Sequence, residues 1–272
     1  MTGIPYAEVI GDPIAQSKSP LIHKFWLDAL GIEGDYRRAH VKSEDLAAYI
    51  AERRADPDWR GCNVTMPHKA AVMELVEDPG DIRCTIGAMN TIVRQPDGLL
   101  IGTNTDAAGF YSPLAELDLE GAPVAVVGAG GAARAVLFAL ARANVGKVTI
   151  FNRSPLKAMG LLATFGLKGD VVALDVALPP VQLLVNSSSL GMTGHPPLDL
   201  DLSALPDDAI VYDLVYSPLQ TELLKTAEAR GLDTIDGLDM LIGQAALAFE
   251  LFFGAPPPEG RDDELRALLV GK

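Results

Sequence analysis

The chain has 272 residues and a mass of 28.8 kDa, a length at which a single hydrophobic core tends to divide into two domains. Hydrophobic residues make up 49% and charged residues 21% of the chain, a balance that excludes disorder as its dominant state. The formal net charge, 22 − 36 = −14, is spread evenly, with −5, −5 and −4 in residues 1–106, 107–235 and 236–272. Because a uniformly acidic surface repels phosphate backbones, we expect no nucleic-acid partner.

Cysteine usage and hydropathy indicate the compartment. Cys62 and Cys84 are too few for a disulfide framework and stand in no metal-ligand spacing, which predicts core thiols in a reducing cytosol. Residues 1–9 contain no basic segment, and Arg134 interrupts the most apolar helical stretch well short of the ~20 residues that cross a bilayer. We therefore expect no metal site, no membrane contact and a cytoplasmic location.

The first part of the chain alternates strand and helix patterns. Strands are expected at residues 7–11, 35–41 and 61–65, helices at 20–30 and 44–54, and another helix opening near Pro67. This alternation predicts a mainly parallel sheet that is covered by helices. Strand patterns at 88–94 and 99–102, split by Gln95-Pro96-Asp97-Gly98, predict a hairpin added to that sheet.

The second part repeats the alternation. A helix at 107–117 precedes a strand at 123–128, a helix at 131–143 and a strand at 147–152. Further strands are expected at 182–186, at 209–213 and near Thr234, with helices at 221–230 and 238–253. We predict an α/β fold with two α/β domains, residues 1–106 and 107–236, and C-terminal helices in 237–272 that return to the first domain.

A glycine-rich turn joins the strand at 123–128 to the helix at 131–143. Gly128 would make the tight turn, Gly130 would let the backbone approach a pyrophosphate, and the small Ala133 would let the helix pack on the strand. The N-terminus of the helix adds free N–H groups and a partial positive charge. This order predicts a Rossmann-type dinucleotide site at Gly128, Ala129, Gly130, Gly131, Ala132 and Ala133, and a plain tight turn is the alternative.

The residues after the next strand indicate which dinucleotide is bound. An acidic residue there would accept the 2′-hydroxyl of NAD, but no Asp or Glu occurs between Val145 and Gly169. Arg153 can pair with a 2′-phosphate, Asn152 and Ser154 can donate to its oxygens, and Lys157 adds positive charge. This set predicts NADP rather than NAD. The alternative is an ordinary exposed helix start with Ser154 as the N-cap.

A polar strand end in the first domain is the candidate for chemistry. Period-two geometry sends Asn63 and Thr65 to the face opposite Cys62. Lys69 follows in the first turn of the helix expected from Pro67, where the helix dipole disfavours the ammonium form and so favours proton transfer. The alternative is a structural lysine at a solvated helix end.

Other polar residues precede expected helices. Asp106 is an N-cap unless a basic partner is found, and Ser19 before Pro20 is also a good N-cap, which leaves Ser17 unexplained. Two hydroxyls at a helix N-terminus would suit a carboxylate. Asn90 and Thr91 add a polar patch to an apolar strand. The histidines, which are His23, His40, His68 and His195, form no metal spacing and are interpreted as structural or exposed.

Together these segments resemble the shikimate dehydrogenase family. The matching motifs are residues 10–20, 63–69, 87–91, 104–106, 128–133, 152–154 and 236–245, which run in order over nearly the whole chain. The resemblance implies reversible, NADPH-dependent reduction of 3-dehydroshikimate to shikimate, a step of aromatic amino-acid biosynthesis. It also implies a substrate-binding domain at 1–106, an NADP-binding domain at 107–236, and a monomer or homodimer.

The resemblance implies a role for each matching residue. Lys69 and Asp106 would be the catalytic pair, and Ser17 and Ser19 would hold the substrate carboxylate. Ring hydroxyls would be bound by Asn63, Thr65, Asn90 and Gln244, with Tyr216 lining the cleft from the nucleotide side. Leu214 and Gly237 would join the cofactor contacts.

The chain departs from the family pattern at a few positions. Ala107 follows Asp106 where glycine is common, Asp239 replaces a residue that is often small, and Ser188 stands where threonine is usual. A quinate or quinate/shikimate dehydrogenase with relaxed substrate or NAD use is the main alternative. A non-catalytic NADP-sensing protein is a further alternative that the presence of both Lys69 and Asp106 disfavours.

Overall fold

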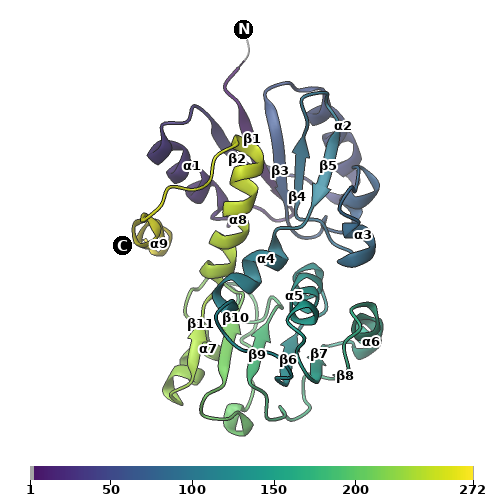
Figure 1. Cartoon of the computed structure of the whole chain (residues 1–272), viewed down its shortest axis with the longest axis vertical. Coiled ribbons are helices and arrows are strands. Elements are labelled where there is room, and N and C mark those ends of the chain that lie inside the picture. The colour runs from purple at the N-terminus through teal and green to yellow at the C-terminus, as the bar shows by residue number, and fades with distance from the viewer. Residues whose placement is uncertain (1–2, 272) are drawn as a thin grey trace. The chain divides into compact units, whose positions relative to one another are not determined.

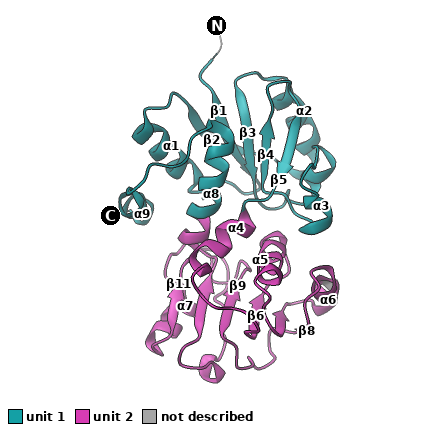
Figure 2. Ribbon diagram, in the orientation of Figure 1, with its two compact units in different colours: residues 1–105, 242–272 teal, residues 106–241 magenta. Residues whose placement is uncertain are grey.

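The computed structural model describes residues 3–271, apart from the side chain of Lys157. The chain forms two compact units, each of which is described by itself (Figure 2). Unit 1 contains the residues up to Thr105 and those from Ile242 onward, and unit 2 contains Asp106–Leu241. Each unit is built around one β-sheet with helices, which confirms the expected α/β class (Figure 1).

The sheet of unit 1 has the strand order β2-β1-β3-β4-β5. Strands β1 (Tyr6–Gly11), β2 (Asp35–His40) and β3 (Trp59–Val64) are parallel. Strands β4 (Thr91–Arg94) and β5 (Leu100–Thr103) add an antiparallel hairpin beside β3, as predicted. The helices of this unit are α1 (Ser19–Leu30), α2 (Leu46–Ala55), α3 (Ile82–Thr85), α9 (Asp262–Val270) and the part of α8 (Gly237–Phe253) from Ile242 onward.

The expectation of a helix opening near Pro67 is wrong. Residues 66–70 form a turn, and only a short 3-10 helix, Ala71–Glu74, follows. Contacts with other segments of unit 1 hold the turn: the buried His68 ring bonds to the carbonyl of Val41 at 2.7 Å, and Met89 N–H donates to the carbonyl of Lys69 at 2.8 Å. Lys69 therefore does not lie in the first turn of an α-helix, and the helix-dipole argument for its chemistry does not apply.

The sheet of unit 2 is parallel throughout, with the order β11-β10-β9-β6-β7-β8. Its strands are β6 (Val124–Val127), β7 (Val148–Phe151), β8 (Gly169–Val172), β9 (Leu183–Asn186), β10 (Ile210–Asp213) and β11 (Asp233–Ile235). Its helices are α4 (Asp106–Tyr111), α5 (Gly131–Arg142), α6 (Pro155–Thr164), α7 (Glu222–Ala229) and the start of α8. The predicted helix at 107–117 is shorter than expected, because Pro113 lacks an N–H and the chain continues as a 3-10 turn, Ser112–Leu114.

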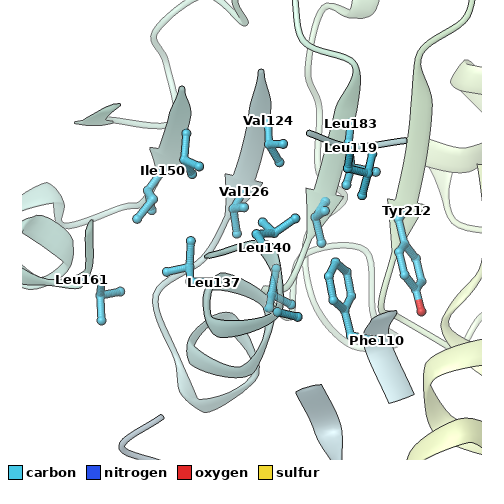
Figure 3. Close-up of a cluster of buried hydrophobic side chains, with 14 of the residues drawn as sticks. Phe110, Leu119, Val124, Val126, Leu137, Leu140, Ile150, Leu161, Leu183 and Tyr212 are labelled. Carbon is cyan, nitrogen blue, oxygen red and sulfur yellow. The ribbon is translucent and has the colours of Figure 1, made fainter. Parts of the chain in front are cut away.

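Hydrophobic packing fixes the sheet of unit 2 against its helices. Figure 3 shows Val124, Val126 and Ile150 from the strands facing Leu137 and Leu140 of α5. Phe110 of α4 stacks on Tyr212 of β10, with ring centroids 5.1 Å apart. These side chains are buried, so the loops at the ends of the strands rest on a rigid base.

The two cysteines differ in burial, and the expectation that both are core thiols is wrong for one of them. Cys62 is a buried core thiol, but Cys84 is exposed on α3, so it is not a core residue. Among residues 3–271, no helix is long and apolar enough to cross a membrane.

Candidate active site and cofactor site

The chain order of the strands marks one position in the sheet of unit 2. From β6 the chain moves outward to β7 and β8, and it then returns to β9 on the other side of β6. Ligands of parallel α/β sheets bind at the carboxyl ends of the strands at such a switch point. Gly128 follows β6 and Ser187 follows β9. The N–H and hydroxyl of Ser187 both donate to the carbonyl of Val127, at 2.9 and 2.7 Å.

Glycine occurs at two positions of this turn for different physical reasons. Gly128 has a φ of +108°, and a Cβ there would lie 3.0 Å from Ser187 Oγ and 3.1 Å from Ser188 N. The fold therefore requires glycine at 128. Gly130, the N-cap of α5, has an ordinary φ of −87°, and a Cβ there would meet no atom of the described residues within 4 Å. Open space before a helix N-terminus is what a dinucleotide pyrophosphate needs, so the turn fits this group.

The remaining residues of the turn continue into α5. Ala133 is 0% exposed, which allows the close packing of helix on strand that the sequence predicted. Ala129, Gly131 and Ala132 are half-buried beside it. The first turn of α5 contains no acidic side chain, so its N–H groups present an uncompensated positive end.

The segment after β7 carries the residues expected to read the 2′-phosphate. Arg153 is exposed, whereas Asn152 and Ser154 are half-buried. Asn152 Nδ2 donates to the carbonyl of Ser154 at 2.9 Å and so closes the turn. Ser154 is the N-cap of α6, but its side chain makes no capping hydrogen bond among the described residues, so capping alone does not explain it. The side chain of Lys157 lies outside the described part of the structure.

A buried polar network at the ends of β9 and β10 was not identified from the sequence. The carboxylate of Asp213, 0% exposed, accepts from Asn186 Nδ2 at 2.8 Å, from Val215 N at 3.0 Å and from Thr221 Oγ1 at 2.7 Å. Burial raises the pKa of the Asp213 carboxyl, while these hydrogen bonds oppose the rise. The signal that could have revealed it is an acidic residue ending a buried strand.

The network shapes the two loops of unit 2 that follow β9 and β10. Asn186 Oδ1 accepts from the N–H and the hydroxyl of Ser188, at 3.1 and 2.7 Å, so serine supplies the bonding hydroxyl at this position. Asp213 holds the N–H of Val215, which fixes the backbone between Leu214 and Tyr216. Gly237 begins α8 against that backbone, where a Cβ would lie 2.5 Å from the carbonyl of Leu214.

Unit 1 has its own switch point, between β1 and β3. After β1 the chain moves to β2 on one side and then crosses to β3 on the other. Ser17 and Ser19 follow β1, and both are buried. Helix α1 starts at Ser19 with Lys18 at the N-cap position, so the expectation that Ser19 is the N-cap is wrong. Instead, Ser17 Oγ accepts from the N–H of Ser19 at 3.3 Å and lies 3.3 Å from Ser19 Oγ.

Two cationic side chains bind backbone carbonyls at the serine loop, which is the segment that carries Ser17 and Ser19. The Arg38 guanidinium donates through Nε and one Nη to the carbonyl of Ser17, at 2.9 and 2.5 Å. The Lys18 ammonium donates to the carbonyl of Leu269 near the end of α9. Among the described residues, neither cation forms an ion pair with a carboxylate. The loop with paired hydroxyls is therefore electrostatically suited to an anion.

The carboxamides expected to bind ring hydroxyls come together in unit 1. Asn63, Asn90 and Gln244 are 5%, 2% and 7% exposed, and Asn90 Nδ2 lies 3.4 Å from Gln244 Oε1. Thr65 is half-buried directly after β3, and its N–H donates to the carbonyl of Ile10 at 2.9 Å. Residues that are more than 150 positions apart in the chain thus share one polar cluster.

The expected catalytic pair is divided between the units. Lys69 is half-buried in unit 1, and its carbonyl is bonded to the N–H of Met89 next to Asn90. Asp106 is the first residue of α4 in unit 2 and is 5% exposed. Its carboxylate therefore belongs to the first turn of this helix.

Sequence comparisons cover most of the chain. A model described as the shikimate dehydrogenase substrate binding domain matches residues 9–92, and a shikimate / quinate 5-dehydrogenase model matches residues 113–186. A shikimate 5'-dehydrogenase C-terminal domain matches residues 237–261. A shikimate dehydrogenase (NADP(+)) from Sphingopyxis alaskensis is 91% identical over 98% of this chain and 97% of its own length.

Solved structures of similar proteins share the fold over its full length. Shikimate 5-dehydrogenase from Thermus thermophilus, in complex with NADP(H) and shikimate, has a TM-score of 0.85 at 37% identity, covering 98% of this chain and 100% of its own. A 5-ketofructose reductase from Gluconobacter sp. strain CHM43 has a TM-score of 0.87 at 30% identity, covering 100% and 99%. With 91% identity to a shikimate dehydrogenase, the chain belongs to the shikimate dehydrogenase family.

Proposed function

We propose that this chain is an NADP-dependent shikimate dehydrogenase that interconverts shikimate and 3-dehydroshikimate. One observation carries the choice of substrate class. Unit 1 buries a set of carboxamides and hydroxyls, and it also carries a loop of paired, buried serines whose backbone is bonded by the Arg38 guanidinium. A ring with several hydroxyls and one carboxylate matches these groups, because amides and hydroxyls can both donate and accept hydrogen bonds and the serine loop favours an anion. An uncharged ketosugar such as 5-ketofructose would leave the serine loop without its anion.

The binding residues divide by the group that they recognise. Ser17 and Ser19 hold the carboxylate, and Asn63, Thr65, Asn90 and Gln244 orient the ring through its hydroxyls. Gly130 and the start of α5 hold the pyrophosphate of the cofactor, and Arg153 pairs with its 2′-phosphate. Leu214, Tyr216 and Gly237 line the nicotinamide side. When bound, NADP⁺ supplies the hydride acceptor for shikimate oxidation.

The protein itself must transfer the proton of the reacting hydroxyl. In oxidation the Lys69 amine accepts this proton, and in reduction the Lys69 ammonium returns it to the same oxygen. Asp106 orients the hydroxyl and stabilises the charged form of the lysine. We further place the enzyme in the cytoplasm, as a monomer or homodimer.

Substitution of the lysine tests this mechanism. Lys69→Ala should lower the turnover number by roughly 10²–10⁴-fold, the usual contribution of one positioned acid-base group. Binding of NADP, measured by calorimetry, should stay nearly unchanged. Asp106→Asn should also be slow, because the amide keeps the shape but loses the charge. The control is Lys42→Ala, which removes an exposed lysine of the same unit. Full turnover in Lys69→Ala would contradict the assignment.

A further inference from the structure

A chain of hydrogen bonds between buried side chains runs through the polar cluster of unit 1. It starts at Tyr36 on β2, passes through Asn63 on β3 and Thr91 on β4, and reaches Asn90. Tyr36 and Thr91 are both 0% exposed, and Asn63 and Asn90 are 5% and 2% exposed. The proposed function gives a role to the two asparagines but none to Tyr36 or Thr91.

The orientation of the Asn63 carboxamide follows from one obligatory acceptor. The backbone carbonyl of Asn90 can only accept, so the atom of Asn63 that lies 3.4 Å from it is the amide nitrogen. This nitrogen also donates to Thr91 Oγ1 at 3.1 Å. The carboxamide oxygen therefore faces Tyr36, whose phenol donates to it at 2.5 Å. Burial raises the pKa of the Tyr36 phenol well above its usual value, which keeps the donated proton in place.

The hydroxyl of Thr91 in turn orients the carboxamide of Asn90. Because Thr91 Oγ1 accepts from Asn63, its hydroxyl hydrogen is left to donate. The nearest acceptor is Asn90 Oδ1 at 3.1 Å, against 3.4 Å for Thr105 Oγ1. The N–H of Thr105 donates to the same Asn90 oxygen at 2.7 Å. Asn90 Nδ2 must then face the other way, toward Thr105 Oγ1 at 2.9 Å and Gln244 Oε1 at 3.4 Å.

We propose that Tyr36 and Thr91 are positioning residues, which fix the orientation of the Asn63 and Asn90 carboxamides and, through the contact of Asn90 with Gln244, the orientation in which Gln244 meets the ring hydroxyls of the substrate. This inference rests on the proposed function for the identity of the substrate. The orientation itself rests only on the hydrogen bonds within unit 1. A carboxamide that turns by half a revolution exchanges its donor and acceptor, so a wrong orientation would oppose a donor with a donor.

Two substitutions at Thr91 separate the hydroxyl from the shape of the side chain. Thr91→Val keeps the shape and removes the hydroxyl, and it should raise the KM for shikimate by about tenfold, the typical loss for one mispaired hydrogen bond. The KM for NADP should change less than about twofold, because a uniform effect on folding would not single out one substrate. Thr91→Ser keeps the hydroxyl and should restore the KM for shikimate. If Ser and Val raise this KM equally, or neither does, the positioning role is contradicted.

A matched pair of tyrosine substitutions tests the other end of this chain of hydrogen bonds. Tyr36→Phe removes the phenol that holds Asn63, whereas Tyr49→Phe removes one that donates to Glu8 in the same unit. Only the first should raise the KM for shikimate, although both should lower the melting temperature. Equal KM values for the two variants would contradict the proposal.

A measurement that needs no turnover keeps this test separate from the proposed function. The side-chain amide protons of Asn63 should exchange slowly in the wild-type protein and faster in Thr91→Val and Tyr36→Phe, as followed by NMR. Tyr49→Phe should leave the exchange unchanged. A wild-type enzyme that does not oxidise shikimate would refute the proposed function, while unchanged exchange in both site variants would refute the positioning role.

Discussion

At the residue scale, the choice of cofactor depends on single charges. Arg153 is exposed on the segment after β7, and the sequence between Val145 and Gly169 contains no acidic side chain that could accept a 2′-hydroxyl. A charge-assisted hydrogen bond to phosphate is worth about 1.5–3 kcal/mol. Arg153→Ala should therefore weaken NADP binding by roughly tenfold to a hundredfold and barely change NAD binding, as measured by calorimetry. Equal weakening of both cofactors would show that Arg153 contacts a part that they share.

A buried histidine makes the stability of unit 1 sensitive to acid. His23 is 0% exposed, stacks on Tyr36 with ring centroids 3.9 Å apart, and has no hydrogen-bond partner for either ring nitrogen among the described residues. Burial lowers the pKa of His23 from 6.5 to about 3. Its neutral form is thus kept in the folded state, while the unfolded state takes up a proton below pH 6.5.

Protonation of His23 in the unfolded state sets how the free energy of unfolding depends on pH. Above pH 6.5 the ring is neutral in both states and contributes no pH dependence, and below it the free energy of unfolding falls as the pH falls. The slope approaches about 1.4 kcal/mol per pH unit, or about 2 kcal/mol of loss near pH 5. His23→Phe should remove this slope in urea titrations, whereas His195→Gln, at an exposed site, should keep it. An unchanged slope in His23→Phe would mean that another group sets the acid sensitivity.

At the element scale, the turn before α5 separates folding from binding. Gly130 has an ordinary φ and open space where a Cβ would point, so Gly130→Ala should change the free energy of unfolding by less than about 1 kcal/mol, because the lower entropy of its unfolded chain offsets the weaker N-capping by alanine. The added methyl group would occupy the space of the pyrophosphate, so NADP binding should weaken by at least about tenfold. Gly160→Ala in α6 is the control, because its Cβ also meets no described atom. Normal NADP binding by Gly130→Ala would contradict the proposed cofactor position.

The elements also indicate what the sequence could and could not predict. Strands β6 and β7 and helix α5 follow from apolar periodicity and lie within a few residues of their expected limits. Strand β8 was missed because it is a short, partly exposed edge strand that begins at Gly169. The helix expected after Pro67 was wrong because contacts of His68 and Lys69 with other segments, which local periodicity does not encode, replace the helical bonds.

At the scale of the whole molecule, the predictable and unpredictable parts of the site differ in origin. The motif at 128–133 is local, so its strand, turn and helix could be read from the sequence alone. The roles of Asn63, Asn90 and Gln244 came from resemblance. Their hydrogen bonds to Tyr36 and Thr91 join residues far apart in the chain, so spacing could not predict them. The network around Asp213 could not be predicted for the same reason.

The central claim concerns which cyclic acid and which cofactor this molecule uses. Quinate differs from shikimate by an added hydroxyl at the carbon that carries the carboxylate, beside the position that we assign to Ser17 and Ser19. A pocket discriminates against one added hydroxyl modestly, unless that group clashes or leaves polar atoms unpaired. The most direct measurement is a spectrophotometric panel of shikimate and quinate, each with NADP and with NAD. We predict that shikimate with NADP exceeds quinate by at least about tenfold in kcat/KM. Comparable values for the two acids, or faster turnover of quinate with NAD, would contradict the account.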